Sequence, residues 1–110
     1  MIILSTPHFD KEAKALLKKY PSLPDDLELL FESLKINPLQ GTPLGNDCYK
    51  IRLAVKSKGK GKSGGARVVT FVRITTNKII LISIYDKSVK VSVSDKELKE
   101  LIKNIPDSLK

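Results

Sequence analysis

With 110 residues, of which 41% are hydrophobic, the chain is long enough for one domain with its own core and too short for a second. Its longest apolar run, residues 79–84, is far below the roughly 20 residues that cross a bilayer, and the N-terminus lacks a signal-peptide pattern. We therefore expect a single domain over residues 1–110, cytoplasmic and without a membrane partner. Cys48 is the only cysteine, which excludes an internal disulfide; we expect a small buried hydrophobe rather than a nucleophile.

The net charge of +8 is concentrated in one part of the chain. Between Cys48 and Tyr85 there is no Asp or Glu, whereas nine of the 20 Lys and Arg residues lie there. The rest of the chain holds all 12 acids against the remaining 11 bases and is close to neutral. A basic face kept only for solubility would mix both signs along the chain. The segregation favours a polyanion as partner.

The first elements predicted along the chain are a short strand and a helix. Residues 1–5 are apolar, and Thr6 and Pro7 supply an N-cap and a proline at the first helical position. Apolar residues then recur at helical spacing with lysines between them. These positions are Phe9, Ala13, Leu16, Leu17 and Tyr20.

A second helix completes a predicted helical hairpin. Pro21 and Pro24 should break the first helix, and a new apolar stripe follows over residues 27–34, stopping before an Asn-Pro pair. Residues 39–47 are rich in Gly and Pro, so we interpret them as a connecting loop.

Three antiparallel strands are predicted next. Residues 49–55 alternate strictly, which places Lys50 and Arg52 on one face and apolar residues on the other. Residues 67–74 are rich in β-branched and aromatic side chains, with Arg67 and Arg73 on a common side. The apolar run 79–84 predicts a strand covered on both faces.

The chain ends with a predicted amphipathic helix. Ser94 and Glu97 form a capping-box pattern before an apolar stripe over residues 98–105, which Pro106 ends. The element order is typical of an α+β fold: strand, helical hairpin, three-stranded antiparallel sheet and C-terminal helix. We expect the helices to cover one face of the sheet and leave the other face to the cations.

The stretch over residues 56–67, KSKGKGKSGGAR, superficially satisfies two phosphate-binding motifs. Gly59, Gly61 and Gly64 fit G-x-G-x-x-G, and the residues after Gly61 resemble the end of a Walker A loop. Walker A would require a glycine where Lys56 stands, and both motifs require a following helix whose amides hold the phosphate. A strand pattern follows instead, so we interpret the stretch as a loop between two strands.

Three motifs together resemble the RelE/HigB toxins of bacterial type II toxin-antitoxin systems, within the RelE/ParE superfamily. They are CYKIRL at residues 48–53, GKGKSGGARVV at residues 59–69, and ISIYDK at residues 82–87, in that order after a helical hairpin. The resemblance spans nearly the whole chain, and the glycine-lysine loop resembles a HigB-like subgroup. It implies a microbial-RNase-like fold and an mRNA interferase, commonly acting on mRNA in the ribosomal decoding site, that a cognate antitoxin neutralises. In such systems the partner can be a helix-turn-helix protein.

The chemistry of RNA cleavage selects candidates within the basic region. Attack by the RNA's own 2′-hydroxyl needs a base, cations for the phosphorane and an acid for the leaving oxygen, and it needs no metal or other cofactor. We see no cluster of Asp, Glu or His at metal-ligand spacing near this region, and no histidine within it. The catalytic candidates are therefore Lys50, Arg52, Arg67, Tyr85 and Lys87.

Roles for these side chains follow from their chemistry. We expect Arg67 to be the main phosphate clamp, because a guanidinium stays charged and reaches two oxygens at once. Lys50 could serve as the base only if its pKa were lowered by roughly 3 units. Tyr85 could stack on a base, and Lys87 stands where many relatives carry an arginine, so the acid is unassigned. We expect backbone contacts to RNA from Lys56, Lys58, Lys60, Lys62 and Arg73.

Alternatives with no catalytic role are open at several of these positions. Tyr85 is about as well explained as a core residue whose hydroxyl contacts water, and His8 as a surface or capping residue. Lys50 and Arg52 could equally cover an open sheet face without binding anything.

For the whole protein, one alternative is a ParE-like toxin that inhibits its target by binding, as that branch does with DNA gyrase. The other is a non-toxic basic domain that binds RNA or the ribosome. An antitoxin would act by covering the basic face or displacing the C-terminal helix.

Overall fold

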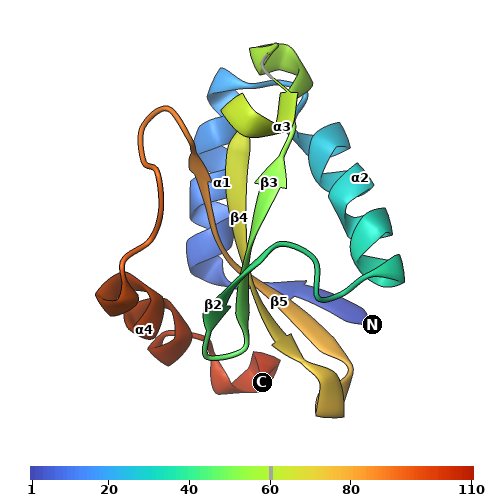
Figure 1. Ribbon diagram of the computed structural model, residues 1–110, viewed down its shortest axis with the longest axis vertical. Coiled ribbons are helices and arrows are strands. Elements are labelled where there is room, and N and C mark those ends of the chain that lie inside the picture. Colours follow the sequence, from blue (N-terminus) through green and yellow to red (C-terminus); the bar gives the residue numbers. More distant parts are fainter. Residues whose placement is uncertain (60) are drawn as a thin grey trace.

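A five-stranded mixed sheet with helices on both faces forms the molecule (Figure 1). The computed structural model describes residues 1–59 and 61–110, except for the side chains of residues 62 and 63. The strands lie in the order β1-β5-β4-β3-β2. They span Ile2–Ser5 (β1), Thr42–Gly45 (β2), Cys48–Leu53 (β3), Ala66–Arg73 (β4) and Lys78–Asp86 (β5).

The helices are α1 (Pro7–Lys19), α2 (Leu23–Ile36), the single turn α3 (Gly61–Gly64) and α4 (Asp95–Lys103). Three short 3-10 turns cover Lys56–Lys58, Ile74–Thr76 and Asp107–Leu109. The predicted helix starts are confirmed: the Thr6 hydroxyl accepts from the Phe9 amide, and Ser94 and Glu97 form a complete capping box.

Two core clusters lie on opposite sides of the sheet. Helices α1 and α2 pack on one face, where Phe9, Leu30 and Leu34 meet apolar residues of β3, β4 and β5. Helix α4 packs on the other face through Leu98, with Ile105 beyond its end, against a cluster that includes Cys48. The prediction that all helices share one face is therefore wrong, because the amphipathic α4 needs its own apolar surface.

The sheet contains two strands more than the predicted antiparallel set. β1 pairs in parallel with β5, and β2 lies within residues 39–47, which we had interpreted as a loop. Strand β2 is four residues long, contains Pro43 and is largely exposed, so it lacks the alternation that marks a strand. Strand β5 is buried on both faces, as predicted.

Three local predictions also need correction. Leu17, predicted on the buried stripe of α1, is 42% exposed, because the stripe that meets the core runs through Leu16 and Tyr20. Pro24 lies in the first turn of α2, where its missing N–H costs no hydrogen bond, and does not separate the helices. The loop between β3 and β4 holds two helical turns, including α3, and is not a plain hairpin connection.

Candidate functional site

A row of predicted site residues crosses three neighbouring strands. The register pairs Arg52 of β3 with Arg67 of β4, and Arg67 with Tyr85 of β5. Lys50 lies one row further along β3, opposite Val69. Side chains of directly paired residues share a face, so these four side chains lie on the face that also carries α4. We call Lys50, Arg52 and Arg67 the basic patch.

Members of the basic patch differ strongly in their exposure. Arg52 is exposed on the outer part of the sheet, Lys50 is half-buried, and Arg67 on the central strand is only 5% exposed. The Arg67 guanidinium donates a hydrogen bond to the backbone oxygen of Ala66 at 3.1 Å. The patch therefore offers one accessible guanidinium, one partly accessible ammonium and one guanidinium enclosed by the fold.

Tyr85 closes the row as a buried phenol. It is 7% exposed and belongs to the core cluster under α4, and its hydroxyl makes no hydrogen bond of normal geometry within the described part of the chain, although the Ser92 hydroxyl interacts with it. Burial raises the pKa of Tyr85, and the positive charge of Arg67 partly opposes that rise. At ordinary pH the residue is a neutral phenol in contact with a cationic neighbour.

The segment of residues 88–94, which we call the cover segment, connects β5 to α4 and lies over this phenol. The Lys90 Nζ sits 5.3 Å from the centre of the Tyr85 ring and forms an ion pair with Glu97 of α4. The Lys50 Nζ donates to the Ser92 hydroxyl at 3.4 Å. Figure 1 shows the cover segment as a long arch from β5 to α4.

Sequence reasoning missed Lys90, Ser92 and Glu97 as neighbours of the site. Lys90 and Ser92 follow the acid-free stretch, and Glu97 was assigned only to the helix cap. The available signal was the alternation of valine with lysine and serine over residues 89–93, which is typical of an extended segment with one side facing the protein.

Lys87 lies directly after β5, where its backbone amide donates to the Gly65 oxygen at 3.2 Å. Lys87 is the first residue of the turn that follows β5, so the alternation of the strand does not fix the direction of its side chain. The structure thus brings Lys50, Arg52, Arg67 and Tyr85 to one face of the sheet, and Lys87 follows Tyr85 two residues later along the chain.

The two loop lysines whose side chains are described, Lys56 and Lys58, do not share a surface. Lys58 turns inward, where its Nζ forms a buried ion pair with Asp86 at 2.5 Å and donates to the Gly65 oxygen. Its ammonium is already paired, contrary to the solvent-facing position that we expected, because the 3-10 turn at this point directs it beneath the loop. Lys56 is exposed, whereas Lys60 and the Lys62 side chain lie outside the described residues.

Arg73 is separated from the other candidates. It lies six residues from Arg67 along β4, which corresponds to roughly 20 Å of extended chain. Its guanidinium sits 5.5 Å from the Phe71 ring centre, near the far end of α4. An RNA molecule that contacts both the basic patch and Arg73 would therefore have to extend along this whole face of the sheet.

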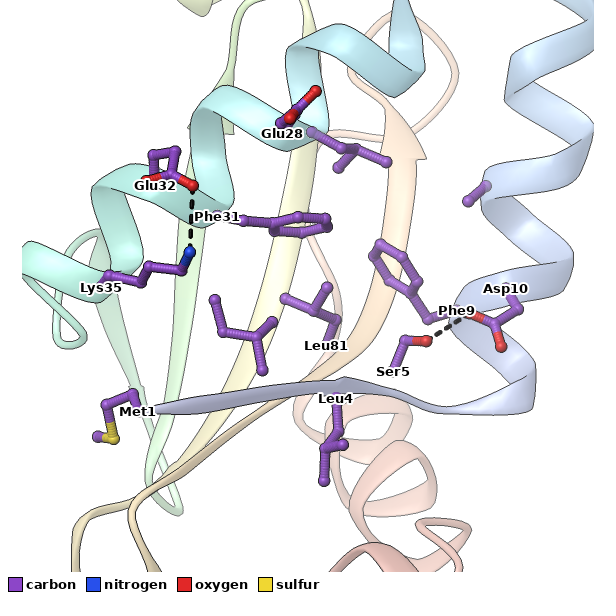
Figure 2. Close-up of a pocket in the computed structure, with 13 residues that line it drawn as sticks. Met1, Leu4, Ser5, Phe9, Asp10, Glu28, Phe31, Glu32, Lys35 and Leu81 are labelled. Carbon is purple, nitrogen blue, oxygen red and sulfur yellow. Dashed lines mark hydrogen bonds and ion pairs between the residues drawn. The ribbon is translucent and has the colours of Figure 1, made fainter.

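The basic patch is not a deep pocket. A cavity of about 690 Å³ lies on the opposite side, between β1, α1 and α2, with Phe9, Phe31 and Leu81 in its lining (Figure 2). Two pairs of polar side chains on its rim bond each other, Ser5 with Asp10 and Glu32 with Lys35. A smaller cavity of about 360 Å³ flanks the cover segment and includes Lys90 and Glu97.

The chemistry of the remaining groups is also set by burial. Burial, followed by the charge of Asp47, raises the pKa of Cys48 to about 12, and the residue is 1% exposed, consistent with its predicted core role. His8 is on the surface and contacts Glu12 at 3.0 Å, at the start of α1. Among the described residues, no group of three or more His, Cys, Asp or Glu side chains is arranged so that it could hold a metal ion. Within that same part of the chain, none of the helices has the length and apolar character of a membrane span.

Comparisons with known proteins agree on the fold. Residues 3–109 match the family model described as RelE toxin of RelE / RelB toxin-antitoxin system. The chain is also similar to the solved structure of the E. coli toxin RelE in the free state, in a variant with two arginines replaced by alanine. The identity is 19% and the TM-score is 0.62, and the match covers 96% of this chain and 97% of that one.

Proposed function

Because the chain belongs to the family of RelE toxins of toxin-antitoxin systems, we propose that it is a toxin that cleaves messenger RNA at the basic patch. One observation carries the proposal: the cross-strand row of Arg52, Arg67 and Tyr85. Two guanidiniums next to a phenol match the needs of a ribose-phosphate linkage with a neighbouring base.

The reaction assigned to this site is an attack by the RNA 2′-hydroxyl on the adjacent phosphorus. Arg67 and Arg52 hold the nonbridging oxygens, whose negative charge grows in the transition state. Lys50 takes the proton of the attacking hydroxyl in the fraction of molecules in which it is a neutral amine. Lys87 returns a proton to the leaving 5′-oxygen, and the Tyr85 ring supports the adjacent base. The proposed products are a 2′,3′-cyclic phosphate and a new 5′-hydroxyl end.

The charge distribution supports the ribosome as the setting and an antitoxin as the silencing partner. The positive charge concentrated between Cys48 and Tyr85 favours association with RNA, and messenger RNA in the decoding site is held extended. The antitoxin of this proposal is a helix-turn-helix protein that acts at the same face, where α4 and the cover segment already contact the site.

Expression of Arg67→Ala in growing cells tests the proposal. Loss of a phosphate clamp costs about 3 kcal/mol of transition-state stabilisation, or more than a hundredfold in rate, so growth arrest should vanish. Lys14→Ala on the exposed side of α1 is the matched control and should arrest growth like the parent. Equal protein levels on immunoblots exclude a folding defect. Arg67→Lys, which keeps the positive charge at this position, is a second variant for the same check of folding. Arrest by Arg67→Ala at parental strength contradicts the assignment.

The burial of Arg67 and Tyr85 favours one second candidate, a toxin that binds its target without cutting it. Primer extension on cellular transcripts separates the two functions, with and without intact ribosomes. A nuclease produces new 5′ ends in expressing cells, and a pure inhibitor stops growth without them.

A further inference from the structure

The starting observation is the buried and poorly satisfied hydroxyl of Tyr85. The residue is 93% buried, and its Oη makes no hydrogen bond of normal geometry among the described residues, although the Ser92 hydroxyl of the cover segment interacts with it. Buried polar side-chain atoms without a well-formed hydrogen bond are rare in native proteins and call for a specific explanation. A ligand that reaches Tyr85 when its cover moves would supply such a hydrogen bond.

The cover segment has the properties of a movable part. It forms neither helix nor strand, and Val89 and Val91 are 79% and 73% exposed. Its first residue, Ser88, is fixed at the end of β5 by hydrogen bonds to Asp86 and from Lys58. Beyond Ser88, the side-chain contacts that hold it over the sheet include the Lys90 ion pair with Glu97, the position of Lys90 over the Tyr85 ring, the Lys50 hydrogen bond to Ser92 and the packing of Val93. Three of these four contacts are made by lysine ammonium groups.

We propose that the cover segment is a gate over Tyr85, and that a polyanionic strand opens it by drawing Lys90 from Glu97 and Lys50 from Ser92. The inference rests on the proposed function for the identity of the polyanion, which is RNA. A phosphate offers each ammonium a charge-assisted hydrogen bond, whereas Ser92 offers a neutral one. Opening then exposes the Tyr85 ring, whose neighbour across the strands is Arg67.

The ion pair between Lys90 and Glu97, which we call the latch, is weak enough for an RNA phosphate to replace Glu97 as the partner of Lys90. The Lys90 and Glu97 side chains are 33% and 47% exposed, so solvent screens their attraction. Removing a pair of this kind changes an opening equilibrium by about threefold. Glutamine at position 97 can still complete the capping box, so Glu97→Gln removes the latch and keeps the start of α4.

Nitration of the three tyrosines by tetranitromethane, mapped by mass spectrometry without RNA, measures the gate directly. In Glu97→Gln, Tyr85 should be nitrated about threefold faster than in the parent. Lys90→Gln removes the other partner of the ion pair and should increase the nitration rate of Tyr85 by a similar factor. Glu100→Gln on the same helix removes the same charge but no ion pair with Lys90 and should match the parent. Tyr49 serves as the internal reference for reagent activity.

The second arm measures binding of a 2′-O-methylated RNA, which cannot be cut. Glu97→Gln should bind it more tightly than Glu100→Gln does, by about threefold. Equal Tyr85 nitration in these two variants overturns the gate, whether or not the parent cleaves RNA. Faster nitration in Glu97→Gln together with no RNA cleavage by the parent leaves the gate standing and removes the nuclease proposal.

Discussion

The buried ion pair between Lys58 and Asp86 makes a sharp prediction for Lys58→Met. The two side chains are 8% and 4% exposed, and Asp86 also accepts hydrogen bonds from the Tyr20 and Ser88 hydroxyls, both at 2.6 Å. Burial alone would raise the pKa of Asp86, but hydrogen bonds from Lys58, Ser88 and Tyr20 outweigh it and hold this pKa well below its usual value. The carboxylate therefore stays charged in the folded protein.

The magnitude follows from what the substitution leaves behind. At 2.5 Å and an effective dielectric constant near 20, the attraction is roughly 7 kcal/mol, which desolvation of the two ions largely offsets. Methionine removes the attraction and leaves the Asp86 charge buried. Loss of one partner from such a pair costs about 3–5 kcal/mol, and the remaining donors place this case near 3 kcal/mol. That is a large part of the stability of a small domain.

Urea unfolding followed by circular dichroism measures the free energy of unfolding of each variant. With a slope of about 1.5 kcal/mol per molar urea, Lys58→Met should unfold at a midpoint about 2 M lower. Lys56→Met, an exposed lysine in the same loop, should unfold like the parent. The double variant Lys58→Met/Asp86→Asn should recover at least about 1 kcal/mol, because no buried charge remains.

The same pair predicts a dependence on pH. Because the pKa of Asp86 is lowered by folding, its contribution is present above the unfolded pKa of about 3.9 and is lost as the pH falls through the folded value. The stability gap between parent and Lys58→Met should be widest near neutral pH and should narrow in acid. A loss below about 1 kcal/mol at neutral pH, or no recovery in the double variant, would refute the reasoning.

Three further predictions concern single positions. Gly65→Ala should lower the free energy of unfolding, measured in urea, by more than about 2 kcal/mol, because an added Cβ would lie 2.0 Å from the Leu53 oxygen and force β3 and β4 apart. If the stability of this variant equals that of the parent, the close approach is contradicted. Ser94→Ala should cost about 1 kcal/mol through loss of the α4 cap, with Ser94→Asp as the restoring control. Cys48, with a raised pKa of about 12, should stay silent to Ellman's reagent in the native protein and react fully after unfolding in guanidinium; a fast native reaction would disprove its burial.

Much of the fold was predictable because its signals are local. Capping residues marked the starts of α1 and α4, and alternation separated the two faces of β3. What failed depends on distant partners. β2 exists because β3 offers it a free edge, and α4 covers the second face because Leu98 and Ile105 find an apolar cluster there. Neither partner is visible within a short window of sequence.

The candidate site shows the same division. Alternation placed Lys50 and Arg52 together, but the alignment of Arg52, Arg67 and Tyr85 in one row depends on strand register. The burial of Lys58 and the position of Lys90 over Tyr85 depend on how loops return to the sheet. Composition indicates how many cations the chain has, and only the tertiary fold determines which of them remain available to a ligand.

The parallel pairing of β1 with β5 sets the order in which the molecule can be finished. Ile2 lies opposite Lys78, so β1 cannot find its partner until β5, the last strand of this sheet along the chain, has been made. Closing such a long stretch of chain is entropically costly and slow compared with forming the α1-α2 pair. Tyr85 lies in that last strand, and Lys87 directly follows it. The row of Arg52, Arg67 and Tyr85 is therefore complete only after β5 has been made, well after β1, α1 and α2.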